Sequence, residues 1–196
     1  MRRDLPALAG LALLLAGCPI PQPLPDYGGG TTTPPRIVAD GATPNDTFVR
    51  IAAGCSGAKP SVTLAASLVD PNTVETVTAR WFVDYDPESS SRRVPLQQTE
   101  VPPPDSGATD PLNRTITPFA FVPYDYPPAV LPAASWDASG VIHVVELVVS
   151  NAFDASGDPP GSAAALPYRS PATGFETQVY RWTVVLVPES GDVTCP

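Results

Sequence analysis

The sequence predicts an all-β protein whose folded part is a two-sheet β-sandwich with long proline-rich loops. Proline accounts for 27 of the 196 residues, well above its usual share of about 5%, which disfavours long helices. Several segments alternate apolar and polar side chains with a period of two, as half-buried strands do. Trp81 lies in one of these segments, where a sandwich core commonly places a tryptophan.

The first strands follow from short apolar segments separated by turn residues. Residues 36–39 form a possible first strand, and residues 40–46 are rich in turn formers. Residues 47–52 form a second strand, with either Phe48 or Val49 facing the core. The alternation over residues 62–68 predicts a half-buried strand.

The later strands include the most strongly patterned segments of the chain. Residues 77–85 alternate so that Trp81 faces the core, and residues 93–99 form at most a short edge strand. Pro118 restricts the strand expected at 114–122 to an edge or a bulge, because proline has no N–H to donate. Residues 141–150 are apolar on both faces, which indicates a central strand. The last expected strand covers residues 176–187.

The N-terminus carries a targeting signal. Arg2 and Arg3 precede an apolar segment too short to span a bilayer, and Leu15-Ala16-Gly17-Cys18 follows. This stretch resembles the lipobox of bacterial lipoproteins. The resemblance implies that the Cys18 thiol receives a diacylglyceryl group with palmitate-like acyl chains, that the chain is cut before Cys18, and that the new amino group is often acylated. An ordinary signal peptide with a chance cysteine is the alternative.

The resemblance also divides the chain and gives it a location. Residues 1–17 are then a signal peptide, residues 18–35 a lipidated, disordered tether rich in Pro, Gly and Thr, and residues 36–196 the β-sandwich domain. Two or three acyl chains anchor a protein stably to a membrane. Residue 19 is Pro rather than Asp, which by the family's sorting habit favours the outer membrane. The net charge of −9 argues against nucleic acid as a partner.

Assigning Cys18 to lipid leaves Cys55 and Cys195 as an even pair in an oxidising compartment. We expect a disulfide between them, with two free thiols as the alternative.

The strand pattern and Trp81 resemble the immunoglobulin-like superfold over about residues 36–193. The resemblance implies that the second half of the first strand runs parallel to the last strand, with Cys55 and Cys195 near the ends of these two segments. The chain departs from antibody domains because no cysteine lies in the strands that antibody domains join by a disulfide. A barrel or a jelly roll remains an alternative.

No set of residues with the pattern of an enzyme stands out, and no cofactor is predicted. His143 lies inside the central apolar segment, where a structural role fits better than catalysis, which needs an accessible partner. Asp84, Asp86 and Glu88 cluster after the Trp81 strand. They are weak calcium candidates, and a solvated acidic loop is the simpler interpretation.

The outward faces of three strands supply a candidate binding face. With Trp81 inward, Arg80 and Phe82 face outward, and the same alternation places Glu146 and Arg181 outward on their strands. We expect Arg80, Glu146 and Arg181 to form an ion-paired row on a face too apolar to be bare. A loop such as residues 124–136 covers this face in one interpretation, and a partner does so in the other.

Together these features predict a membrane-anchored envelope lipoprotein with a non-enzymatic module for binding, adhesion or recognition of envelope proteins. The alternative is a structural accessory subunit of an envelope complex. A carboxylate-dependent hydrolase is a third interpretation, which no carboxylate spacing supports.

Overall fold

The computed structural model of the chain describes residues 33–53, 59–126, 141–154 and 169–188. The chain divides into two units, Met1–Thr31 and Thr32–Pro196, and all described residues belong to the second. Lipidation at Cys18, the signal peptide, most of the tether and the pairing of Cys55 with Cys195 therefore lie outside the described residues. No helix among the described residues has the length and apolar character needed to cross a membrane.

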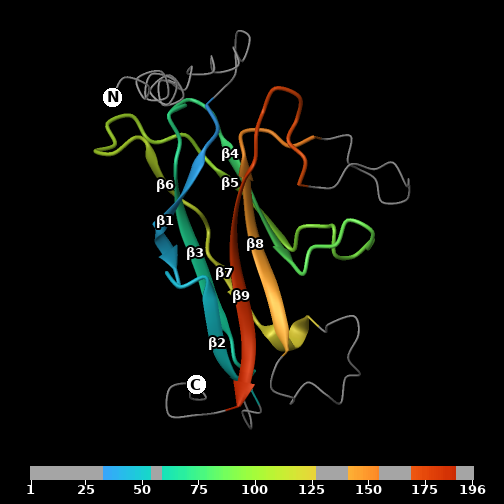
Figure 1. Cartoon of the computed structure of the whole chain (residues 1–196). Coiled ribbons are helices and arrows are strands. Elements are labelled where there is room, and N and C mark those ends of the chain that lie inside the picture. Colours follow the sequence, from blue (N-terminus) through green and yellow to red (C-terminus); the bar gives the residue numbers. More distant parts are fainter. Residues whose placement is uncertain (1–32, 54–58, 127–140, 155–168, 189–196) are drawn as a thin grey trace, which may run out of the picture. The chain divides into compact units, whose positions relative to one another are not determined.

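The described part is all-β and consists of two sheets, as the proline content and the alternation predict (Figure 1). The strands are β1 Arg36–Thr43, β2 Phe48–Ala53, β3 Val62–Val69, β4 Val77–Val83, β5 Gln97–Val101, β6 Asn113–Thr115, β7 Phe119–Phe121, β8 Ile142–Ser150 and β9 Gln178–Pro188. A short 3-10 helix, η1, covers Pro123–Asp125.

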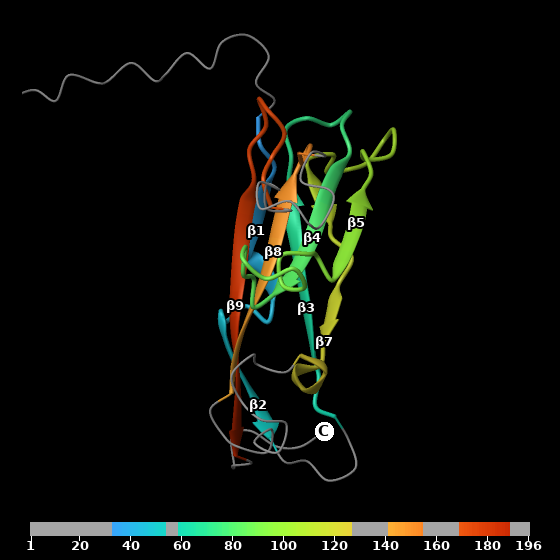
Figure 2. The same cartoon turned by 90° about the vertical axis from the view of Figure 1, so that its right-hand side faces the viewer.

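The larger sheet has the order β2-β9-β8-β4-β5, and Figure 2 shows its last four strands side by side in one layer. The smaller sheet contains β1, β3, β6 and β7. β2 runs parallel to β9, from Phe48 beside Thr183 to Ala53 beside Pro188, as the resemblance implies. β8 lies between β4 and β9, which confirms the central position predicted from its two apolar faces.

Three strands differ from the sequence prediction. β5 covers Gln97–Val101, whereas the edge strand was expected at residues 93–99. β1 continues through residues expected to form a turn and ends at Thr43, with a register shift after Val38. Gly41 lies in this irregular part, where a Cβ would sit 2.5 Å from Ser67 Oγ, so a larger residue would require the Ser67 side chain to move. The strand expected around Pro118 is divided into β6 and β7, which both pair with β3. The missing N–H of Pro118 explains the break.

An aromatic stack holds the two sheets together. Trp81 is completely buried and stacks on Trp182 of the same sheet, with ring centroids 5.6 Å apart. It also stacks on Phe119 of the smaller sheet, at 5.4 Å. The Trp182 indole N–H donates to the Pro44 carbonyl at 2.9 Å, which ties the link between β1 and β2 to the core.

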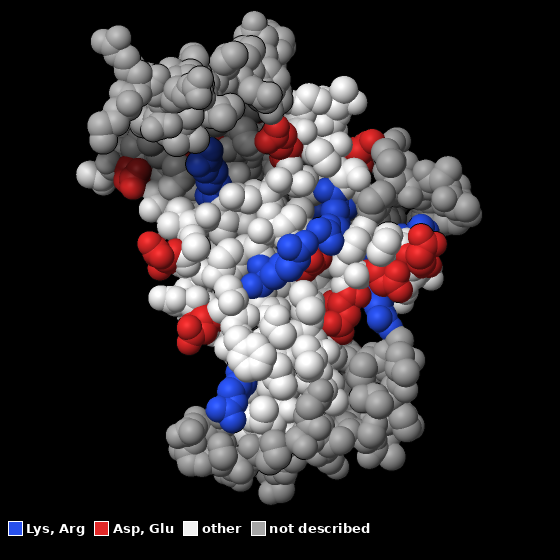
Figure 3. All heavy atoms as spheres, in the orientation of Figure 1, with Lys and Arg blue, Asp and Glu red and all other residues white. Residues whose placement is uncertain are grey.

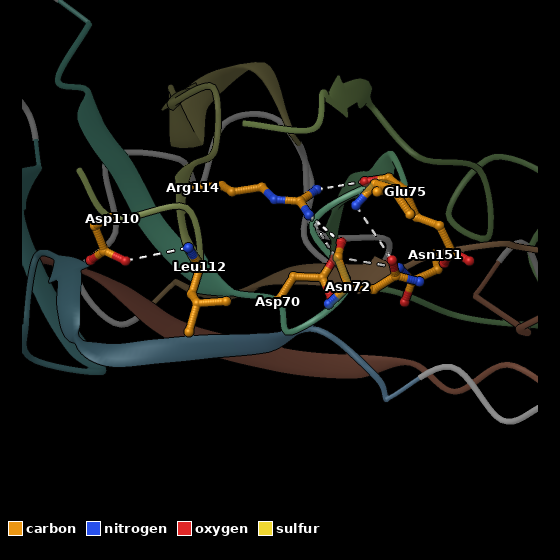
Figure 4. A network of polar contacts seen from close by, with 8 residues as sticks. Asp70, Asn72, Glu75, Asp110, Leu112, Arg114 and Asn151 are labelled. Carbon is orange, nitrogen blue, oxygen red and sulfur yellow. Dashed lines mark hydrogen bonds and ion pairs between the residues drawn. The ribbon is translucent and has the colours of Figure 1, made fainter. Parts of the chain in front are cut away.

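A buried ion pair secures one end of the sandwich (Figure 4). Arg114 of β6 lies 3.1 Å from the carboxylate of Asp70, which follows β3, and both side chains are almost completely buried. Arg114 also donates to the backbone carbonyls of Glu75 and Asn72, in the turn that leads to β4. The Asp70 carboxylate accepts the Asn72 N–H at 2.9 Å. The pair thus joins both sheets through the β3–β4 turn.

Replacing Arg114 with Met should lower the unfolding free energy by about 3–5 kcal/mol, because the Asp70 carboxylate would stay buried without its counter-charge. Urea denaturation measures this change. Lys59→Met is the matched control, because Lys59 and Asp125 form an exposed ion pair, whose loss should cost less than about 1 kcal/mol. Equal costs for the two variants would show that the buried pair has no special role.

Candidate functional site

Strand register places the predicted outer-face residues in two different rows of the larger sheet. Phe82 pairs with Glu146, and Glu146 pairs with Arg181. Arg80 instead pairs with Val148, one row further along the sheet. The row expected from the sequence, Arg80, Glu146 and Arg181, is therefore corrected: Phe82 occupies the position beside Glu146.

Glu146 is the centre of an ion-paired cluster. Its side chain is buried, and one carboxylate oxygen accepts from Arg181 Nε at 2.5 Å. The other oxygen accepts from Arg169 Nη1 at 2.8 Å. A carboxylate out of water needs such partners. The sequence pattern does not predict Arg169, because Arg169 lies outside the expected strands and no strand register places it.

Arg80 takes part in a separate cluster near β5. Its Nε donates to the side-chain oxygen of Gln98 at 2.8 Å, and its guanidinium lies 4.0 Å from the ring centroid of Phe153. This geometry is a cation–π contact. Arg80 is thus held in place on the outer face of β4.

The half of the outer face over β4 is covered. Phe82 is completely buried, and the ring of Tyr85 packs edge-on against it at 5.3 Å. The Arg169 guanidinium lies 4.3 Å from the Tyr85 ring centroid. Among the described residues, Tyr85, which follows β4, and Arg169 cover this half of the face. Most of the loop that was expected to cover it, residues 127–136, lies outside the described residues.

The half of the same face over β2, β9 and the start of β8 exposes large side chains. Val49 packs in the core, so the neighbouring Phe48 faces outward and is 57% exposed. Ile142 is 56% exposed, and so is the side chain of Arg181. Phe48 and Val144 both pair with Thr183, which places them in the row next to Arg181. We call Phe48, Ile142, Val144 and Arg181 the open patch.

Figure 3 shows basic side chains crossing the middle of one molecular face as a diagonal row among uncharged side chains. This concentration contrasts with the net charge of −9. Arginine and large aromatic residues are the types enriched in the energetically dominant parts of protein interfaces.

Asp84 and His143 form a pair at the end of β4. His143 is completely buried and packs edge-on against Phe121, which is the environment expected of a structural histidine. Its Nδ1 lies 2.7 Å from Asp84 Oδ2, while Asp84 Oδ1 accepts the Val144 N–H at 2.8 Å. Asp84 has a positive φ of 48°, a conformation that aspartate tolerates better than most residues.

The three calcium candidates do not come together as a ligand set. Asp84 is bonded to His143 and Val144, whereas Asp86 accepts the N–H of Glu88 at 3.0 Å in a local turn. Over the described ranges, no group of three or more His, Cys, Asp or Glu side chains is placed to hold a metal ion.

Tyr85 has a raised pKa. Burial is the largest cause, and the positive charges of Arg169 and Arg93 oppose it in part. Glu146 and Asp86 add to the increase in the pKa through their negative charges. Within the described part of the chain, the Tyr85 hydroxyl is buried without a hydrogen-bond partner.

Comparison with known proteins adds no relative to this picture: no protein-family model, curated protein or solved structure matches the chain.

Replacing Glu146 with Gln should destabilise the domain by about 2 kcal/mol. Removing the negative charge leaves two arginines facing each other, and the half-exposed position of Arg181 lets water offset part of the cost. Glu100→Gln is the control, because Glu100 is exposed and bonded to Thr78. Thermal unfolding compares the two variants, and an unchanged midpoint for Glu146→Gln would rule out a structural role for the cluster.

The stability of the protein should fall at high pH partly because of Tyr85. Because the pKa of Tyr85 is raised in the folded protein, the unfolded chain loses the phenol proton at a lower pH than the folded chain does. The contribution of Tyr85 to the unfolding free energy is therefore fully present below pH 10.0. It is lost as the pH rises through the pKa of the folded state. Tyr85→Phe should make the decline in unfolding free energy above pH 10.0 less steep. Burial also raises the pKa of Tyr126. Among the wild type and the variants, the double variant Tyr85→Phe, Tyr126→Phe should therefore show the smallest fall in unfolding free energy above pH 10.0. A Tyr85→Phe slope equal to that of the wild type would contradict this assignment.

Proposed function

We propose that this chain is a lipid-anchored protein of the bacterial envelope, with an immunoglobulin-like sandwich that binds a protein partner and performs no catalysis. Support for the anchor is the sequence Leu15-Ala16-Gly17-Cys18 after a short apolar segment. Support for the immunoglobulin-like class is the parallel pairing of β2 with β9 and the buried Trp81.

The open patch is the observation that carries the binding role. Phe48 and Ile142 are more than half exposed on a sheet whose other outward apolar residues are largely buried. Arg181 lies one row from Phe48 and two rows from Ile142 on the same face, and its Nε donates to the buried Glu146 carboxylate. A fixed arginine next to exposed apolar side chains combines a specific charge with area that gains from losing water. A protein partner with a carboxylate among apolar residues would match this surface.

Site-specific photo-crosslinking in intact cells tests the binding role. A photoreactive residue at position 142 should give an adduct of discrete mass, and adding Phe48→Ser should reduce its yield several-fold. The same photoreactive residue at position 74 is the control, because Val74 is 80% exposed in the turn between β3 and β4. Equal adducts at both positions, or none at position 142, would count against the open patch as an interface.

Metabolic labelling with a palmitate analogue tests the anchor separately. The wild-type chain should take up the label and remain with the membranes, and Cys18→Ala should do neither, because the acylated thiol is gone. Cys55→Ala is the matched control and should keep the label. A Cys18→Ala protein that still carries the label would refute lipidation at this position.

A further inference from the structure

A cavity of about 270 Å³ lies where β4 ends, between the segment that leads to β5 and the helix η1. Its lining does not include any residue of the open patch. Apolar residues of the lining include Val94, Leu96 and Tyr126, and its charged residues are Asp84, Arg92 and Asp125. The volume is just below the range of about 300–1,000 Å³ found for drug-sized ligands, so a smaller molecule fits.

Asp84 gives the cavity a fixed negative group. Its carboxylate is held by His143 on one oxygen and by the Val144 N–H on the other, and the side chain is still 22% exposed. A carboxylate has about four acceptor positions, so two remain for a ligand.

Arg92 gives the cavity a positive group, and no described residue competes for its guanidinium. Its guanidinium makes no hydrogen bond or ion pair with the residues that the structure describes. Asp125, the other carboxylate of the lining, is already paired with Lys59 at 2.5 Å. Arg92 is therefore able to bind a carboxylate of a ligand in the two-point geometry typical of arginine.

We propose that this cavity binds a free α-amino acid with an apolar side chain. The ligand ammonium would donate to Asp84, and the ligand carboxylate would accept from Arg92. The side chain would lie against Val94, Leu96 and Tyr126. A ligand with only a negative charge would be repelled by Asp84, and a ligand with only a positive charge would leave Arg92 without a partner. A molecule that carries both charges therefore matches the lining best.

Calorimetric titration of the full-length chain with leucine and two analogues tests this assignment. 3-Methylbutylamine lacks the carboxylate of leucine, and 4-methylpentanoate lacks the amine. Leucine should bind about ten-fold or more tightly than either analogue, because each analogue leaves one charged group of the cavity without its partner. Equal binding of leucine and an analogue, or no binding of leucine to folded protein, would overturn the proposal.

Two variants assign the two ends of the ligand. Arg92→Ala should weaken leucine about ten-fold without weakening 3-methylbutylamine, and Asp84→Asn should weaken leucine without weakening 4-methylpentanoate, because each variant also removes the charge that repels the analogue. Asparagine tolerates the positive φ of residue 84, and Arg92→Ala decides the outcome alone if Asp84→Asn fails to fold. Arg50→Ala is the matched control, because Arg50 is exposed on β2 and outside the lining. Equal losses for Arg50→Ala and Arg92→Ala would refute the site. Phe48→Ser should leave leucine binding unchanged, which separates this cavity from the open patch.

Discussion

The stack of Trp81 between Trp182 and Phe119 is the contact on which the rest of the sandwich depends. It joins the two sheets, and it decides which face of each strand in the larger sheet is buried. Side chains alternate along a strand, so an inward Trp81 requires an outward Phe82. Register then carries this choice across the sheet to Glu146 and Arg181. The candidate site on the outer face is thus a consequence of packing in the core.

Two buried carboxylates of the described structure are paired with arginine. Asp70 is paired with Arg114, and Glu146 is paired with Arg169 and Arg181. In both cases the carboxylate is out of water and gains partners from a segment distant in sequence. A paired buried charge is weak evidence for extra stability, but loss of one partner is costly. These pairs therefore act chiefly to hold particular segments in one arrangement.

The outer face of the larger sheet has one covered half and one exposed half. Over β4, Tyr85 packs against the buried Phe82 and carries Arg169 on its ring. Over β2 and β9 the same face leaves Phe48 and Arg181 in contact with solvent. Glu146 lies where the two halves meet, with Arg169 on one oxygen and Arg181 on the other. The proposed interface thus adjoins an ion-paired cluster centred on Glu146.

The sequence by itself determined the all-β class, the inward position of Trp81, the central place of β8 and the edge position of the segment around Pro118. These follow from local rules: a period of two, apolar character on both faces, and a missing N–H. Only the tertiary structure decided that Phe48 faces outward, that Arg169 pairs with Glu146, and that Arg92 and Asp84 line one cavity. Contacts such as that of Arg169 with Glu146 form between residues that are far apart in the sequence. Local periodicity carries no information about where the connecting loops return to the sheet, because their placement depends on packing between residues far apart in the chain.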